Sequence, residues 1–153
     1  MEIADLMTRQ VQCCAPEDSL EQAARLMWDH DCGCLPVCSG ADGGVRTVGL
    51  ITDRDICMCA LFEGAPLSQL RVEQAMAKHV LGCSPDDSVE QAERVMQSAR
   101  VRRLPVLSAR GDLLGMVSLA DLAREAERGR REAAASSIGH TFAAIVEPLV
   151  PHS

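Results

Sequence analysis

Two short segments combine a hydroxyl side chain with a carboxylate three residues later, directly after an apolar run. The residues are Thr52 and Asp55 in the first segment, and Ser118 and Asp121 in the second. This spacing is typical of a helix N-terminus, where the hydroxyl accepts a backbone N–H bond and the acid faces the positive end of the helix dipole. Such a helix start also suits an anion, and a carboxylate can accept both hydroxyls of a ribose. The pattern predicts two helix caps and leaves nucleotide binding, metal binding and catalysis to be weighed.

Three arginines offer partners for a phosphate near these segments. Arg54 lies inside the first segment, and Arg102 and Arg103 precede the apolar run "LPV" upstream of the second. A guanidinium presents a planar fork of donors that matches a phosphate. The competing interpretation of Arg102 and Arg103 is a solvated start of a strand, and both interpretations stay open.

Eight cysteines offer a different chemistry. Five of them fall between residues 32 and 59, with C-x-C spacings instead of the C-x-x-C pairs of a zinc ribbon. A buried cysteine is most often a small apolar side chain. A zinc or redox site is the weaker alternative, because cysteines two apart on a strand share a face. Its candidate residues are Cys32, Cys34, Cys57 and Cys59.

Charge and composition argue against a nucleic-acid-binding protein. The net charge is −7 and the sequence pI is about 5.0, whereas a nucleic-acid binder usually carries a strong basic patch. Aromatic residues make up 2% of the chain, so surfaces for base stacking are scarce. We expect no nucleic-acid partner.

The N-terminus and the apolar segments indicate the compartment. The opening "MEIADLM" is acidic and lacks the apolar core of a secretory signal. No window approaches the roughly 20 apolar residues that a membrane-spanning helix needs. We therefore expect a cytoplasmic protein without a membrane partner. We also expect no enzyme, because no nucleophile or acid–base pair is assembled by motif.

An internal repeat supplies the elements that must position these residues. Residues 7–37 align without gaps with residues 76–106, 69 positions later, and "GLITDRDI" matches "GMVSLADL" 66 positions later. Ser19 and Ser88 each begin an amphipathic helix with a glutamine three residues on. "LPV" begins a strand in each copy, "GADGG" and "ARGD" are hairpin turns, and the second strand of each hairpin ends at Thr52 or Ser118. Each copy therefore reads β-α-β-β-α.

The segment after Asp121 is rich in Ala, Glu and Arg, which predicts a helix to about Arg131 or beyond. The later "FAAIVEPLV" is apolar enough to pack on a partner subunit or on the first copy, and a disordered tail is the alternative.

The tandem repeat resembles the cystathionine-β-synthase (CBS) domain, and the pair resembles a Bateman module. The resemblance is carried by P-x-D-S-h-x-x-A, by L-P-V and by G-h-h-[ST]-x-x-D, over roughly residues 3–125. It implies an α/β (α+β) fold of two β-α-β-β-α repeats with pseudo-two-fold symmetry. We assign repeat 1 to residues 1–65, repeat 2 to 66–125, and a C-terminal helix and tail to 126–153.

In proteins similar to this chain, the aspartate binds ribose, the Thr or Ser contacts ribose or phosphate, and adenine enters an aliphatic cleft between the copies. The resemblance thus implies a regulatory sensor for an adenine nucleotide (AMP, ADP, ATP or an adenosyl ligand), acting as a homodimer on an unknown protein target, with no cofactor required. Many relatives have Thr or Ser near the base on the first strand, where this chain has Cys13 and Gly82. The alternative function is a thiol- or zinc-responsive stress protein without nucleotide. The implied nucleotide-binding residues are Thr52, Arg54, Asp55, Arg102, Arg103, Ser118, Asp121, Cys13 and Gly82.

Overall fold

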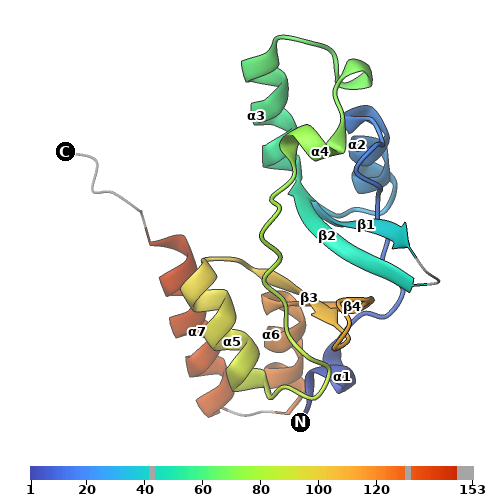
Figure 1. Ribbon diagram of the computed structural model, residues 1–153. Coiled ribbons are helices and arrows are strands. Elements are labelled where there is room, and N and C mark those ends of the chain that lie inside the picture. Colours follow the sequence, from blue (N-terminus) through green and yellow to red (C-terminus); the bar gives the residue numbers. More distant parts are fainter. Residues whose placement is uncertain (42–43, 130–131, 148–153) are drawn as a thin grey trace. The chain divides into compact units, whose positions relative to one another are not determined.

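The computed structural model describes residues 1–41, 44–129 and 132–147 of the 153-residue chain (Figure 1). The chain forms two compact units, each built from more than one segment. One unit holds Met1–Arg9, Leu81–Ala109 and the described residues from Leu114 on, and the other holds Gln10–Val80 with Arg110–Leu113. We call them the second-repeat unit and the first-repeat unit, after the copy that dominates each.

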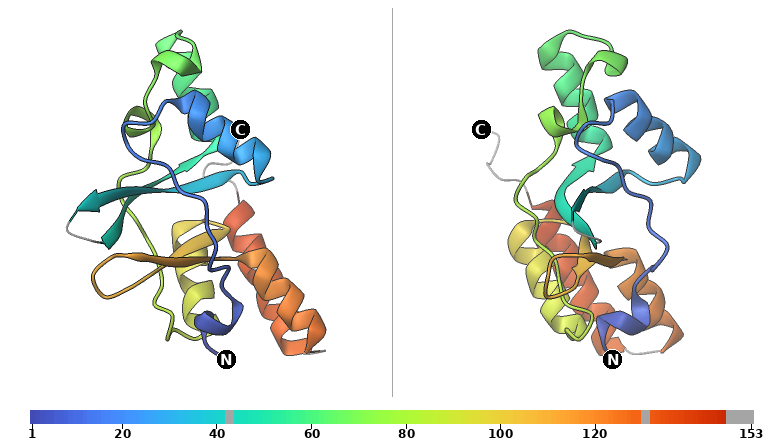
Figure 2. Two further views of the ribbon diagram at one scale, coloured as in Figure 1. Left: turned by 90° about the vertical axis from the view of Figure 1, so that its right-hand side faces the viewer. Right: turned by 45° about the vertical axis from the view of Figure 1, so that its right-hand side comes forward.

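The first-repeat unit contains a hairpin covered on one face by helices. Ser19 caps α2 (Leu20–Asp29) through the predicted capping box with Gln22. Strands β1 (Cys34–Ala41) and β2 (Gly44–Thr52) pair antiparallel and form the long curved hairpin seen in Figure 2. Then follow α3 (Asp53–Glu63), a 3₁₀ turn (Leu67–Gln69) and α4 (Val72–Ala75). The buried core consists of Cys14, Leu20, Ala23, Met27, Leu35, Val37, Ile51, Ile56, Leu70 and Val72.

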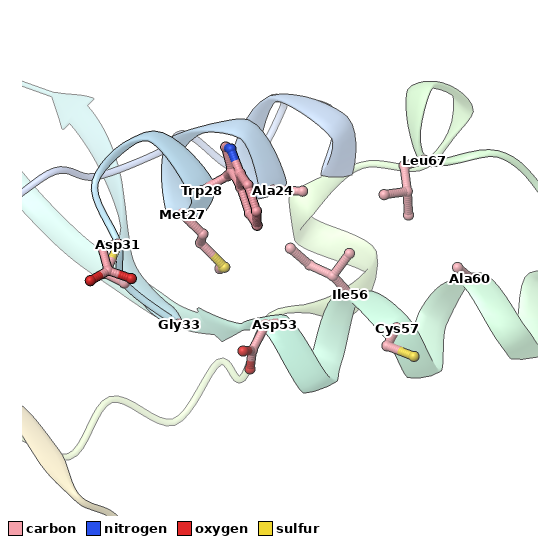
Figure 3. A pocket seen from close by; sticks show the side chains of 11 residues that line it. Ala24, Met27, Trp28, Asp31, Gly33, Asp53, Ile56, Cys57, Ala60 and Leu67 are labelled. Atoms are coloured by element: carbon pink, nitrogen blue, oxygen red, sulfur yellow. The ribbon is translucent and has the colours of Figure 1, made fainter.

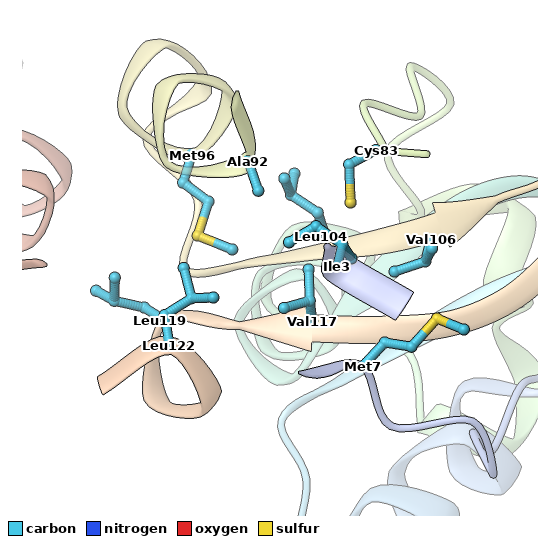
Figure 4. Packing of buried hydrophobic residues seen from close by; sticks show 10 residues of the cluster. All are labelled: Ile3, Met7, Cys83, Ala92, Met96, Leu104, Val106, Val117, Leu119 and Leu122. Carbon is cyan, nitrogen blue, oxygen red and sulfur yellow. The ribbon is translucent and has the colours of Figure 1, made fainter. Parts of the chain in front are cut away.

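The second-repeat unit has the same plan. It contains α5 (Val89–Ala99), β3 (Arg103–Leu107), β4 (Leu113–Ser118) and α6 (Leu119–Arg128), together with the N-terminal α1 (Ile3–Leu6). The expected fold of two repeats, each with two helices and a hairpin, is confirmed. The turn predicted at "ARGD" is present, whereas the centre of "GADGG" lies outside the described residues. Figure 4 shows the core, which consists of Ile3, Met7, Cys83, Ala92, Met96, Leu104, Val106, Val117, Leu119 and Leu122.

The first residues of each aligned copy pair with the hairpin of the other copy. Thr8 exchanges two backbone hydrogen bonds with Met116 of β4 (2.8 and 2.9 Å), and Ala77 does the same with Leu50 of β2 (2.8 and 3.0 Å). Strand β4 needs a glycine at position 115, because a Cβ at Gly115 would lie 2.7 Å from the Thr8 carbonyl oxygen. The compact units therefore interleave the two copies, and the repeat boundaries at residues 65 and 125 stay predictions.

The C-terminal region differs from the sequence-based expectation. α6 ends at Arg128 with Gly129 as its cap, and a separate helix, α7 (Glu132–Val146), follows. α7 packs beside α5 and α6 (Figures 1 and 2), with Ile138 and Ile145 against the second-repeat core. The described part of this segment thus packs on the second copy, and its packing on a partner subunit or on the first copy stays a prediction. The remainder of "FAAIVEPLV", from residue 148, lies outside the described residues.

Candidate functional site

The start of α3 holds Thr52 and Asp55 in a reciprocal arrangement. Thr52 Oγ1 accepts the Asp55 N–H at 3.2 Å, and Asp55 Oδ2 accepts the Thr52 N–H at 2.9 Å. Both residues are half-buried. Among the described residues, none donates a hydrogen bond or ion pair to the second oxygen, Asp55 Oδ1. The predicted cap is therefore present, and one carboxylate oxygen is left for a ligand.

The start of α6 repeats this geometry and adds a cation. Asp121 Oδ2 accepts the Ser118 N–H at 2.8 Å and the Ser118 hydroxyl at 2.6 Å, and the Asp121 N–H donates to Ser118 Oγ at 3.2 Å. Arg124 Nη2 forms an ion pair with Asp121 Oδ1. The corresponding residue of the first copy is Met58. Sequence reasoning missed Arg124, although its i,i+3 spacing from Asp121 is a known signal for a helical ion pair.

The two predicted basic residues lie beside the start of α6. The Leu119 N–H, in the first turn of α6, donates to the Arg102 carbonyl oxygen at 2.8 Å. Arg102 is exposed and Arg103 is half-buried at the start of β3. The structure thus brings Arg102, Arg103, Ser118 and Asp121 together within one unit.

The same place in the first-repeat unit has an acid, Asp53, beside its helix start. The Asp53 N–H donates to the Gly33 carbonyl oxygen at 3.1 Å, which is the counterpart of the Leu119–Arg102 bond. A Cβ at Gly33 would lie 3.0 Å from Asp53 Oδ2, so the Asp53 carboxylate fills the space beside this backbone. Arg54 is exposed, and its backbone N–H donates to Asp53 Oδ1 at 2.8 Å. The two helix starts therefore share their caps and differ in local charge.

Cys13 and Gly82 lie on the short extended segments that pair with β1 and β3. The neighbouring Cys14 N–H donates to the Pro36 carbonyl oxygen at 3.1 Å, and the Cys83 N–H to the Pro105 carbonyl oxygen at 3.0 Å. Gly82 has room for no side chain, because a Cβ there would lie 2.8 Å from the Pro105 carbonyl oxygen. Their predicted role near an adenine base stays a prediction.

Two capped helix starts in a repeated hairpin-and-helix unit match one known family. The CBS domain family matches this chain twice, at residues 3–60 and 72–128. The chain belongs to the CBS domain family.

Relatives and solved structures agree with this assignment. The CBS domain-containing protein YhcV of Bacillus subtilis is 35% identical over 79% of this chain and 82% of its own length. The structure of Hypoxic Response Protein I with two coordinated zinc ions is 32% identical, with a TM-score of 0.71 over 82% of this chain and 98% of that one. The CBS domain pair of MJ0100, in complex with 5-methylthioadenosine and S-adenosyl-L-methionine, shares the fold at 21% identity, with a TM-score of 0.73 over 86% and 98% of the two chains. This chain is a CBS pair, a class of regulatory module.

The zinc ions in Hypoxic Response Protein I raise the question whether the cysteines of this chain could bind a metal. Cys32 and Cys57 line one groove, whereas Cys34 and Cys59 do not. Burial, with a contribution from Glu63, raises the pKa of Cys59, which disfavours the thiolate that binds metals. Within residues 1–41, 44–129 and 132–147, no three His, Cys, Asp or Glu side chains gather closely enough to hold an ion. The described residues of a single chain therefore do not fit the zinc alternative.

A groove between α2 and α3 was not anticipated from the sequence (Figure 3). Its volume is about 650 Å³, and Met27, Trp28 and Ile56 are among its lining residues. Trp28 is 87% exposed, and Leu61 and Phe62 on α3 are 69% and 79% exposed. None of the predicted nucleotide residues is among the residues that line this groove.

The corresponding face of the second-repeat unit is covered by α7. Ser137 Oγ donates to the buried Glu93 Oε2 at 2.6 Å, and Gln97 Nε2 donates to Thr141 Oγ1 at 2.7 Å. The residues that match Glu93 and Gln97 in the first copy are Ala24 and Trp28, so the first copy lacks the carboxylate that accepts from Ser137. These two bonds stabilise the packing of α7 on the second copy.

Among the described helices, none combines the length and the apolar character that crossing a membrane demands.

Proposed function

We propose that this CBS pair binds an adenosine-containing ligand at its two helix starts and acts as a regulatory sensor. The observation that carries the proposal is the carboxylate of Asp55, which is fixed by the Thr52 N–H through one oxygen while the other has no partner among the described residues. A carboxylate held in this way is oriented in advance to accept the two hydroxyls of a ribose. The same fold in MJ0100 is known with adenosyl ligands.

Local charge distinguishes the two helix starts. At α6, Arg102 and Arg103 supply positive charge for phosphates, while Arg124 competes for Asp121. At α3, Asp53 stands in the corresponding place, and Arg54 is the cation available. We expect the α3 site to favour an adenosyl ligand or AMP, and the α6 site to gain more from additional phosphates.

Equilibrium binding of AMP, ATP and S-adenosylmethionine to the full chain tests this proposal. Asp55→Ala and Asp121→Ala should each weaken binding by at least about tenfold at one site, because each removes the predicted ribose acceptor. Glu21→Ala is the matched control, since it removes a first-turn acid of α2 whose partner is Arg25. No binding of any of the three ligands, with both aspartate variants unchanged, would overturn the proposal.

We also infer that the exposed face formed by Trp28, Leu61 and Phe62 binds a second copy of this chain. Three large apolar side chains are highly exposed on two helices, α2 and α3, that contact each other, and exposed apolar residues of this kind are typical of an interface. The chain's own α7 covers the corresponding face of the second-repeat unit. A homodimer through the open face agrees with the homodimer that the CBS resemblance implies.

A further inference from the structure

Cys13 and Cys38 lie next to each other in the first-repeat unit, on segments 25 residues apart in sequence. Backbone bonds fix their separation, since the Cys38 N–H donates to the Cys14 carbonyl oxygen at 2.8 Å and the Cys14 N–H donates to Pro36. Cys13 lies close enough to Cys38 to contribute to the raised pKa of the Cys38 thiol. The two sulfur atoms are therefore neighbours in the native fold.

The two corresponding residues of the second copy also lie next to each other. Its counterparts of Cys13 and Cys38 are Gly82 and Leu107. A Cβ built on Gly82 would lie 3.1 Å from Leu107 Cγ and 2.9 Å from its Cδ1. Side chains at these two positions thus point at each other, as a disulfide requires.

The pair lies outside the first-repeat core cluster. Cys14 belongs to the first-repeat core cluster, whereas Cys38 is buried but is not part of that cluster. Successive residues of an extended segment face opposite sides, so Cys13 lies on the side away from the core. Cys13 is exposed and is open to a reagent from solvent.

We propose that Cys13 and Cys38 form a redox-active dithiol that closes to a disulfide. The Cys13 thiolate attacks one sulfur of a small-molecule disulfide such as oxidised glutathione, forming a mixed disulfide and releasing one thiol. Cys38 then loses its proton and attacks Cys13 Sγ, which releases the second thiol. The two cysteines lose two protons and two electrons, and the oxidant becomes two thiols.

The environments of the two thiols assign these roles. Burial raises the pKa of Cys38 to about 11, so this thiol is protonated at neutral pH and suits the second, intramolecular step. Proximity compensates for the small thiolate fraction, because the reacting sulfurs are already held together. The exposed Cys13 meets the oxidant first.

A consequence for regulation rests on the proposed function. The CBS resemblance implies that Cys13 lies near the base, so under the proposed function a disulfide there would alter the surroundings of the adenine. We expect oxidation to weaken binding of an adenosyl ligand by about fivefold or more.

Peptide mapping of the full chain under non-reducing conditions tests the disulfide directly. After incubation with oxidised glutathione, we expect one linked peptide pair containing Cys13 and Cys38, and loss of two hydrogens from the intact mass. Cys13→Ser should abolish the link and is expected to fold, because Cys13 is exposed. Cys57→Ser, which removes another exposed thiol, should leave it intact. A glutathione adduct that persists on Cys13, or a link between other cysteines, would overturn the proposal.

Binding of S-adenosylmethionine and AMP to reduced and oxidised protein tests the coupling separately. Equal affinities with the disulfide mapped would overturn the coupling and leave the redox site standing. No binding in the reduced protein would overturn the proposed function itself, whatever the mapping shows.

Discussion

Arg124 and Asp121 form an ion pair at the start of α6, whereas Met58 occupies the corresponding position beside Asp55 in α3. The Arg124 side chain is 63% exposed and that of Asp121 is 17% exposed, so water weakens the pair without abolishing it. The Asp121 carboxylate is thus partly engaged by an arginine, whereas the corresponding Asp55 carboxylate has no such ion pair among the described residues.

Replacing Arg124 with methionine, as in the first repeat, should raise ligand affinity at the α6 site by about two- to fivefold, because the ligand no longer competes with an exposed ion pair. Calorimetry in an Asp55→Ala background isolates this site. Arg25→Met removes a comparable exposed pair with Glu21 and should change nothing. Weaker binding after Arg124→Met would instead make Arg124 a ligand contact.

Thr52→Ala should lower the free energy of unfolding by about 0.5–2 kcal/mol, because the Asp55 N–H then loses its acceptor. Thr52→Ser keeps the hydroxyl and should retain most of the stability. Urea unfolding measures the difference. If the alanine and serine variants were equally stable, the hydroxyl would have no capping role.

The repeat accounts for why so much could be predicted from the sequence. Ser19, Ser88, Thr52 and Ser118 all cap helices as expected, because capping depends on residues within one helical turn. Contacts between segments that are far apart in the sequence could not be predicted from such local patterns. The bond from Ser137 to Glu93 spans 44 residues, and the contact of Cys13 with Cys38 depends on how a short segment pairs with β1.

Gly82→Ala should destabilise the protein by about 1–3 kcal/mol, because the new Cβ would lie 2.8 Å from a backbone oxygen and 2.9 Å from Leu107. Gly40→Ala is the control, since no atom lies within 4 Å of its Cβ. Thermal unfolding of both variants measures the contrast. Equal stability would show that the segment moves freely away from β3.

Phe62→Glu should convert a dimer to a monomer, because it places a charge in the apolar face with Trp28 and Leu61. Analytical ultracentrifugation measures the change. Val45→Glu alters a similarly exposed apolar residue on β2, outside this face, and should keep the dimer. Wild-type protein that sediments as a monomer at every concentration would contradict the predicted interface.

Closure of the disulfide from the mixed Cys13 intermediate should accelerate by about tenfold per pH unit from about pH 7 to 9. Burial, the largest cause of the raised pKa of Cys38, persists in this intermediate, so the Cys38 thiolate fraction increases throughout this range. The groups facing Cys38 are the Cys13 sulfur, which carries no thiol in the intermediate, the Cys14 thiol and the Thr47 hydroxyl. Quenched-flow mass spectrometry follows the step, and a rate independent of pH would rule out Cys38 as the attacking thiol.

The central claim is that Asp55 and Asp121 each hold the ribose of a bound ligand. Titration calorimetry of the reduced full chain with an adenosine ligand that binds wild type tests it most directly, because the number of sites per chain is measured. We predict two sites in wild type, one in Asp55→Ala, one in Asp121→Ala and none in the double variant. Two sites of unchanged affinity in the double variant would contradict the account.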